Sequence, residues 1–220
     1  MKTFRIALIH AMPVAIEPVC NTFKRLWPQA KVTNLLEDSL AADLAAAGRI
    51  DQKMIDRFRT LAKYSEDSGA DAVLFTCSAF GPAIEAARAA VNIPVLKPNE
   101  AMMEEAIETG SRIALLATFE PSLASMKAEL EQLAAARSTR IEITTKAAPA
   151  AMVALAAGDS AAHDAQIAAA AEEIGDCDAL LLCQFSMASA AERIPSRRGR
   201  SVFTSPYSAV ARLKQLLNAA

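Results

Sequence analysis

The chain has 220 residues, and 53% of them are hydrophobic, which is enough to bury a substantial core in one large or two small domains. Its net charge of −2 gives no excess of positive charge with which to bind nucleic acid or an anionic membrane surface. The apolar N-terminal run from Phe4 to Ile9 is interrupted too early for a secretory signal or a membrane span. We therefore expect a cytoplasmic protein that binds neither nucleic acid nor membrane.

Runs rich in Val, Ile, Leu and Phe alternate with longer stretches of helical period, which is typical of a parallel sheet covered by helices on both faces. This pattern predicts an α/β fold. Two helices are expected to stop at Gly48 and Gly158, which follow alanine-rich segments. The predicted strands, in chain order, are Arg5–Ile9, Lys31–Leu35, Ala72–Thr76, Val95–Leu96, Ile113–Ala117, Ile141–Thr145, Ala179–Leu182 and Val202–Phe203.

The sequence contains an internal repeat with an offset of 107 residues. The run RIALI that begins at Arg5 recurs as RIALL beginning at Arg112. The run DAVLFTC that begins at Asp71 recurs as DALLLC beginning at Asp178, so each copy closes on a cysteine. We interpret the repeat as two copies of one supersecondary unit.

The repeat predicts two pseudo-symmetric lobes, each a mainly parallel sheet of about four strands flanked by helices. We assign the first lobe to residues 1–100, the second to 101–205, and residues 206–220 to a C-terminal helix that packs back on the first lobe. Parallel sheets place ligand sites at the carboxyl ends of their strands, so residues directly after each strand are the candidates for function. None of these positions carries a glycine-rich phosphate loop, and the cysteines lack zinc-type spacing, which argues against a nucleotide or metal site.

Cys77 follows the third predicted strand and precedes a helix with Pro82 near its first turn. Free backbone N–H groups and the positive end of the helix dipole lower the pKa of a thiol in this position, so we expect a usable base near neutral pH. The same N–H groups, with the hydroxyls of Thr76 and Ser78, would seat a substrate carboxylate. The alternative is an ordinary buried cysteine at a strand end.

Other polar residues also follow predicted strands. Thr118 is either a helix cap or a ligand contact. His10 is a candidate for substrate binding, although a lone histidine is more often structural. Asn34 either offers its amide to a carboxyl group or belongs to a polar turn. The second histidine, His163, lies in an alanine-rich helix and is expected on the surface.

These motifs resemble the aspartate/glutamate/hydantoin racemase superfamily over nearly the whole chain, on the segments Gly69–Ser78, Asp178–Met187 and Leu115–Thr118. The resemblance implies an active site between two lobes, one acid/base cysteine in each lobe, no cofactor and a homodimer. In such racemases one thiolate removes the proton α to a carboxyl or carbonyl group, and the other thiol returns a proton from the opposite face. Among the relatives that the resemblance brings in, arylmalonate decarboxylase keeps one of the two cysteines, and maleate isomerase uses a cysteine as nucleophile.

The second copy of the motif departs from the family pattern. Cys77 stands six residues after the aspartate of its strand, as family cysteines do, whereas Cys183 stands five residues after its own and Gln184 holds the sixth position. Because side chains alternate faces along a strand, this displacement turns the Cys183 thiol away from the cleft unless a bulge restores it. Gln184 and Ser186 would then bind a carboxylate or stabilise an enolate.

Three functions remain open at this stage. The leading hypothesis is a cofactor-independent racemase or epimerase of a small carboxylate or carbonyl compound, with Cys77 and Cys183 as the two thiols and no metal. The alternative enzyme is a decarboxylase or cis–trans isomerase that uses Cys77 alone. The third is a protein that binds a small carboxylate without catalysis. The residues predicted to bind substrate are His10, Asn34, Thr76, Ser78, Thr118, Gln184 and Ser186.

Overall fold

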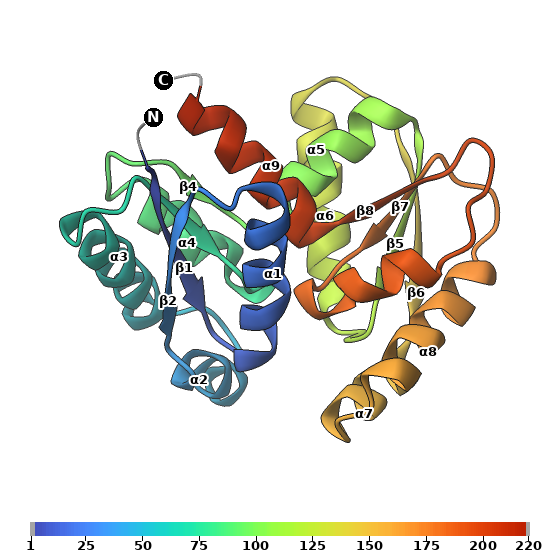
Figure 1. Ribbon diagram of the computed structural model, residues 1–220, viewed down its shortest axis with the longest axis horizontal. Coiled ribbons are helices and arrows are strands. Elements are labelled where there is room, and N and C mark those ends of the chain that lie inside the picture. The colour runs from blue at the N-terminus through green and yellow to red at the C-terminus, as the bar shows by residue number, and fades with distance from the viewer. Residues whose placement is uncertain (1–2, 219–220) are drawn as a thin grey trace. The chain divides into compact units, whose positions relative to one another are not determined.

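The computed structural model describes residues 3–218, which form two units that are described separately here (Figure 1). Unit 1 holds the chain up to Pro98 and the residues from Ala209 onward, and unit 2 holds Asn99–Ser208. Each unit contains one four-stranded parallel sheet flanked by helices, so the predicted α/β class is confirmed. Among the described residues, no helix combines the length and apolarity that crossing a membrane requires.

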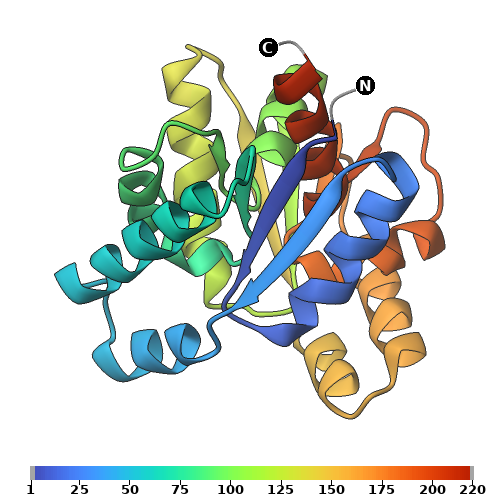
Figure 2. The same cartoon turned by 60° about the vertical axis from the view of Figure 1, so that its left-hand side comes forward.

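The sheet of unit 1 has the strand order β2-β1-β3-β4. Helices α2, α3 and α4 cover one face of it, and α1 lies on the other side (Figure 2). The elements of this unit are β1 (Arg5–His10), a 3-10 turn η1 (Pro13–Ala15), α1 (Ile16–Leu26), β2 (Lys31–Leu36), α2 (Ser39–Ala47), α3 (Gln52–Asp67), β3 (Ala72–Phe75), η2 (Ser78–Phe80), α4 (Gly81–Arg88), β4 (Val95–Leu96) and most of α9 (Ser205–Asn218).

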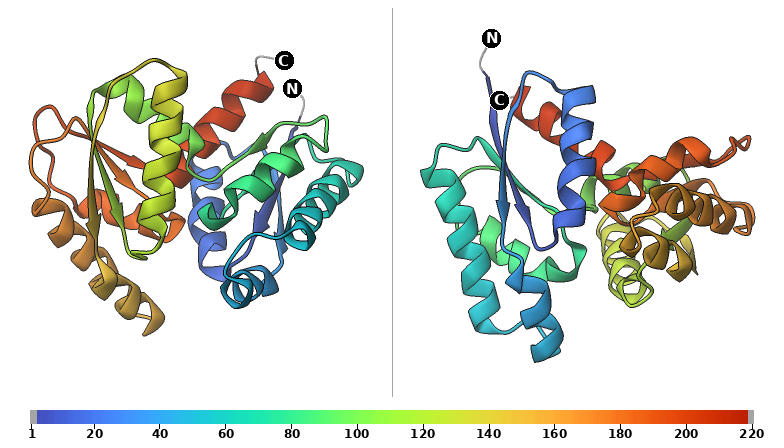
Figure 3. Two further views of the ribbon diagram at one scale, coloured as in Figure 1. Left: turned by 180° about the vertical axis from the view of Figure 1, so that it is seen from behind. Right: turned by 60° about the horizontal axis from the view of Figure 1, so that its bottom comes forward.

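The sheet of unit 2 has the matching order β6-β5-β7-β8. Helices α5 and α6 pack on one face, and α7, α8 and η3 pack on the other (Figure 3). The elements of this unit are α5 (Glu100–Thr109), β5 (Arg112–Ala117), α6 (Ser122–Ala136), β6 (Glu142–Ala147), α7 (Pro149–Ala156), α8 (Ser160–Glu172), β7 (Ala179–Leu182), η3 (Phe185–Arg193) and β8 (Ser201–Thr204).

All eight predicted strands are present, and their bounds move by at most two residues. The predicted helix stops are also confirmed. Gly48 ends α2 with a φ of 65°, and Gly158 follows α7 with a φ of 79°. Glycine adopts this left-handed conformation without the steric cost that a Cβ atom would add, which is why both helices end there.

The repeated aspartates anchor the central strand of each sheet. The Asp71 carboxylate accepts a hydrogen bond from the backbone N–H of Arg5 at 2.8 Å. Asp178 accepts from the N–H of Arg112 at 2.9 Å and from that of Ser111 at 3.0 Å. In both units the aspartate stands just before one strand and accepts a hydrogen bond from a backbone N–H at the start of the neighbouring strand. This bond sets the register of the two strands.

Side chains alternate between the two faces of each sheet, as the pleat requires. In β7, Ala179 and Leu181 pack toward α5 and α6, whereas Leu180 and Leu182 pack toward α7 and α8. In unit 1, Val73 and Phe75 pack toward α3 and α4. Stacked aromatic rings, with centroids of Phe58 and Phe75 5.0 Å apart, close the core on that face.

Replacing Gly110 by Ala is expected to destabilise the protein by about 1–3 kcal/mol, because it overpacks the aspartate anchor of unit 2. A Cβ atom at Gly110 would lie 2.4 Å from the Cβ of Asp178. The φ of Gly110 is 173°, so lack of space and not backbone strain causes the loss. Urea unfolding measures the change. Gly175→Ala is the control, since a Cβ atom there meets nothing within 4 Å, and equal stability of the two variants would contradict the anchor.

Candidate functional site

A hydrogen-bonded chain with the buried His10 at its centre crosses the carboxyl end of the sheet in unit 1. His10, the last residue of β1, has no exposed surface. Its Nδ1 lies 2.9 Å from the Thr76 hydroxyl, and its Nε2 lies 2.9 Å from Oδ1 of the exposed Asn34. The thiol of Cys20 in α1 donates to the same Asn34 oxygen at 3.5 Å. The predicted residues His10, Asn34 and Thr76 are thus brought together.

The acceptor role of the Asn34 oxygen determines the tautomer of His10. Nε2 carries the proton that Asn34 accepts, which leaves Nδ1 to accept from the Thr76 hydroxyl. Burial lowers the pKa of His10, and the hydrogen bond with Asn34 offsets part of this shift. The ring is therefore neutral at pH 7 and links β1 to its neighbours. Direct contact of this buried ring with a substrate stays a prediction.

Cys77 lies between β3 and η2 and is half-buried. Its side chain packs against the core formed with α3 and α4, and its sulfur accepts a hydrogen bond from the backbone N–H of Ala79. Burial raises the pKa of the Cys77 thiol and outweighs that hydrogen bond. The lowered pKa expected from the helix terminus is therefore wrong. Cys77 is a protonated thiol at neutral pH.

The hydroxyls beside Cys77 have different surroundings. Thr76 is buried and bonds to His10, so its side chain lies on the sheet face opposite to that of Cys77. Ser78 is half-buried, and its hydroxyl makes no hydrogen bond within residues 3–218. Of the two hydroxyls predicted to seat a carboxylate, Ser78 is the one with a free donor.

Gln184 occupies the carboxyl end of β7 in unit 2. Its Oε1 accepts from the backbone N–H of Thr118 at 2.9 Å, and its Nε2 donates to the Ser122 hydroxyl at 3.1 Å. The Thr118 hydroxyl lies 3.4 Å from the same Oε1 and is buried. Thr118 is not the cap of α6, whose N-cap position is Pro121. Thr118 and Gln184, each predicted to bind substrate, are thus brought together, with one N–H of the amide left to donate.

The register shows that Gln184, and not Cys183, is the equivalent of Cys77. Phe75 pairs with Ile9, and Leu182 pairs with Leu116, at the repeat offset of 107. One residue further on, the N–H of Thr76 donates to Ile9, and that of Cys183 donates to Leu116, both at 3.0 Å. The ladder continues without a bulge. Cys183 therefore takes the place of Thr76.

The Cys183 side chain belongs to the apolar core of unit 2. It is 1% exposed, packs on the face that also holds Leu115 and Leu181, and donates to the Leu181 carbonyl at 3.4 Å. Burial raises the pKa of the Cys183 thiol. Such surroundings are typical of a small apolar side chain in a protein core. The catalytic role of Cys183 stays a prediction, which its burial disfavours.

Two further residues of unit 2 complete the comparison with the sequence. Ser186 is half-buried and, in the part of the chain that the structure covers, makes no hydrogen bond. The surface position expected for His163 is wrong. It is 1% exposed, with Nδ1 2.9 Å from an oxygen of Asp164 that also accepts from Ser189 at 2.8 Å. The packing of α8 against η3 buries the ring.

The sequence patterns did not identify Cys20, which donates a hydrogen bond to Asn34, or Ser122, which accepts one from Gln184. Cys20 lies on α1 and Ser122 starts α6, so each contact forms only when a helix packs beside a strand end. No local signal could have identified these contacts. In residues 3–218, no group of three or more His, Cys, Asp and Glu side chains gathers as a metal site would require.

Comparison with protein families by sequence gives one match, to the model described as Asp/Glu/Hydantoin racemase, over residues 27–213. No curated protein matches the sequence significantly. The match covers the strand ends that carry Asn34, Cys77, Thr118 and Gln184.

Solved structures of racemases share the fold. An aspartate racemase homologue from Pyrococcus horikoshii has a TM-score of 0.71 at 16% identity, with 99% of this chain and 100% of that chain covered. Allantoin racemase from Klebsiella pneumoniae has a TM-score of 0.69 at 18% identity, covering 99% and 89%. A glutamate racemase from Bacillus anthracis has a TM-score of 0.70 at 14% identity, covering 100% and 83%. At these identities the likeness concerns the fold alone.

The buried neutral His10 is expected to make stability depend on pH. Its folded-state pKa lies below the unfolded value near 6.5, so the unfolded chain binds more protons in that window. The free energy of unfolding should therefore fall as the pH is lowered from 6.5 toward about 5, before most carboxylates titrate. Urea midpoints at several pH values measure the slope.

His10→Asn should flatten this slope, since it removes the titrating ring. The matched control is His163→Asn, which changes the other of the two histidines and leaves His10 with its partners. Equal slopes in the wild-type protein and His10→Asn would contradict the assignment.

Proposed function

The chain belongs to the Asp/Glu/hydantoin racemase family, and from this membership we propose that it transfers a proton at the carbon α to a carboxyl group of a small acid, with Cys77 as the acting thiol. The reaction needs no cofactor, because a carboxyl group can delocalise the electron pair of the intermediate. Ser78 and the backbone N–H groups at the start of η2 hold the carboxylate that remains bound.

The position of Gln184 supports a mechanism with one thiol. It stands at the position of unit 2 that corresponds to Cys77 in unit 1, and a neutral amide is not an acid or base of comparable strength. Cys183, one residue earlier, is buried among apolar side chains. Gln184 is instead suited to donate a hydrogen bond to a substrate oxygen with its remaining N–H.

The raised pKa of Cys77 supports the role of proton donor. A protonated thiol is ready to donate its proton and is a poor base, so it suits a reaction in which the carbanion forms by loss of a group other than a proton. Decarboxylation meets this condition. The bond between the α-carbon and one of two carboxyl groups breaks, CO₂ leaves, and the electron pair is delocalised as an enediolate. The Cys77 thiol then gives its proton to the α-carbon, and solvent reprotonates the thiolate. We therefore place a one-thiol decarboxylase first.

Racemisation by two thiols is the second candidate, and membership of a family described by its racemases favours it. It requires Cys183 to exchange protons with the same substrate molecule as Cys77. The two candidates differ in what each cysteine contributes, so matched substitutions separate them.

Incubation in deuterium oxide with amino acids, hydantoins and 2-substituted malonates tests the proposal. We expect CO₂ release from a malonate and one deuterium at the α-carbon of the product, in a single configuration. Cys77→Ala should lower the rate at least about 100-fold, because a positioned general acid contributes that much or more. Activity that survives this substitution would refute the role of Cys77.

Cys183→Ala is the matched control for the second thiol. It should leave the rate within a few-fold of wild type and cost about 1 kcal/mol of stability, because it empties a small volume in the core. The two-thiol racemase would be established instead if the protein racemised an amino acid or a hydantoin and if Cys77→Ala and Cys183→Ala each abolished that activity.

A further inference from the structure

A cluster of polar side chains joins α8 to η3 in unit 2. The Asp164 carboxylate on α8 accepts a hydrogen bond from the Ser189 hydroxyl on η3 at 2.8 Å. The same oxygen lies 2.9 Å from Nδ1 of the neighbouring His163. Because a carboxylate only accepts hydrogen bonds, Nδ1 carries the proton and donates it. Asp164 therefore binds one donor on its own helix and one donor on η3.

The Asp164 carboxylate lies where water has little access. Its side chain is 11% exposed, and that of His163 is 1% exposed. Nε2 of His163 is buried and has no partner within residues 3–218, so the bond to Asp164 is the one that holds the ring. A carboxylate is costly to bury unless hydrogen bonds replace its hydration. The bonds from His163 and Ser189 therefore fix the direction of the Asp164 side chain.

The order of these contacts differs from that of a hydrolytic triad. In such a triad the histidine lies between the carboxylate and the serine, and it takes the proton of the serine. Here the carboxylate of Asp164 lies between His163 and Ser189, and the serine donates to it directly. The cluster thus holds two elements together and is not arranged to activate a nucleophile.

The element that Asp164 holds begins directly after Gln184 and has an unusual conformation. It continues as a 3-10 helix for nine residues, Phe185–Arg193. Runs longer than three or four residues are uncommon, because the hydrogen bonds of a 3-10 helix have poor geometry. In unit 1 the equivalent η2 has three residues, and the α-helix α4 begins at Gly81. η3 therefore depends on contacts with other elements to keep its shape.

The three-residue turn of a 3-10 helix puts Ser186 and Ser189 on the same side of η3. Burial follows the same period, since Met187 and Ala190, which are also three residues apart, both belong to the core shared with α8. Rotation of η3 about its axis would turn the two serine hydroxyls together. The bond from Ser189 to Asp164 therefore sets the direction in which Ser186 presents its hydroxyl.

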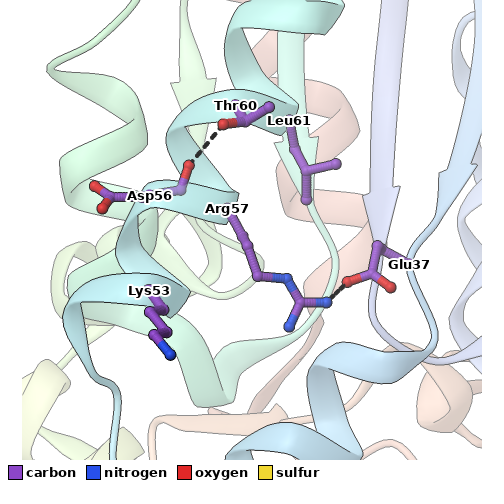
Figure 4. A pocket seen from close by; sticks show the side chains of 6 residues that line it. All are labelled: Glu37, Lys53, Asp56, Arg57, Thr60 and Leu61. Carbon is purple, nitrogen blue, oxygen red and sulfur yellow. Dashed lines mark hydrogen bonds and ion pairs between the residues drawn. The ribbon is translucent and has the colours of Figure 1, made fainter.

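The charged cluster on α3 in unit 1 is more exposed. Arg57 binds Glu37 and Asp43, whose side chains are 30% and 53% exposed. The pocket beside this cluster has a volume of about 450 Å³ and is lined by Glu37, Lys53, Asp56, Arg57, Thr60 and Leu61 (Figure 4). Water and salt screen ion pairs in such a position, so these pairs constrain their elements weakly. The buried bond to Asp164 is the stronger anchor.

We propose that Asp164 is a positioning residue, which sets the rotation of η3 and thereby directs the Ser186 hydroxyl, beside the Gln184 amide, toward a substrate oxygen. His163 orients the Asp164 side chain, and Ser189 passes this orientation to η3. The role of Ser186 rests on the proposed function, which supplies the substrate oxygen. The backbone N–H groups in the first turn of η3 have no partner within the helix and donate in the same direction.

Hydrogen exchange followed by mass spectrometry tests the anchor without any substrate. Ser189→Ala removes a hydroxyl from an exposed residue, so we expect the protein to fold. Exchange of the η3 amides should become at least about tenfold faster, because a hydrogen bond to a charged group is lost. Peptides from η2 and α4 should not change. Ser189→Thr, which keeps a hydroxyl, should restore the wild-type rate. An unchanged η3 rate in Ser189→Ala would overturn the proposal.

Steady-state kinetics with a malonate tests the positioning of Ser186. Ser189→Ala should raise KM about fivefold and leave kcat within about twofold, because a bond to an oxygen that stays in place is equally strong before and during the reaction. A purely structural role would instead lower kcat with the amount of folded protein and leave KM unchanged, which would contradict the proposal. The matched control is Ser201→Ala, which changes an exposed serine at the start of β8 and should alter neither constant.

A double-mutant cycle tests whether Ser189 acts through Asp164. Asp164→Ala removes the acceptor and should raise KM by about as much as Ser189→Ala does. In the Asp164→Ala background, Ser189→Ala should change KM by less than about twofold, since the anchor is already lost. Additive effects of the two substitutions would show that Ser189 acts independently of Asp164.

Binding of malonate separates failure of this proposal from failure of the proposed function. Titration calorimetry should show that Ser189→Ala raises the dissociation constant of malonate about fivefold. Such a rise without turnover of any malonate would keep the positioning role and reject the one-thiol decarboxylase. Turnover with the same KM and the same malonate affinity in both proteins would do the reverse. Absence of both binding and turnover in the wild-type protein would reject both proposals.

Discussion

The alternation of side chains along β3 and β7 is the constraint on which the candidate site depends. Each strand pairs in register with the central strand of its sheet, and the repeated aspartates hold the starts of those pairs together. With the register held, a shift of one residue at the end of a strand exchanges the two faces. Cys77 and Gln184 therefore correspond, while Cys183 corresponds to Thr76 and joins the core. The chemistry of each unit follows from this one-residue difference.

Burial then determines the protonation states of the Cys77 thiol and the His10 ring at the strand ends. A helix terminus favours a thiolate at Cys77, but the loss of hydration in a half-buried position costs more than one backbone hydrogen bond returns. His10 is kept neutral for the same reason, although Asn34 stabilises its charged form. The end of the first sheet thus presents a protonated thiol on one face and an uncharged polar chain on the other. This combination suits the delivery of a proton to a carbanion better than the removal of one from a carbon.

Much of the fold was predictable because its signals are local. Periodicity located all eight strands, alanine-rich runs ending at Gly48 and Gly158 located two helix stops, and the offset of 107 between Asp71 and Asp178 revealed two similar units. Several of the polar residues predicted after strands also lie together within a unit, since parallel strands bring their ends to one edge. Contacts that need a helix to pack against a strand end were not predictable. The bond of Cys20 to Asn34 is one of these.

The sequence by itself determined the α/β class, the repeat, the family resemblance and the displacement of one cysteine by one residue. Tertiary structure decided what that displacement means, because a bulge would have returned the thiol to the equivalent position and the uninterrupted ladder to Leu116 does not. It also decided the direction of the pKa shift at Cys77 and the burial of His163. Both are set by how much water the surrounding helices exclude, and that quantity depends on residues far apart in the chain.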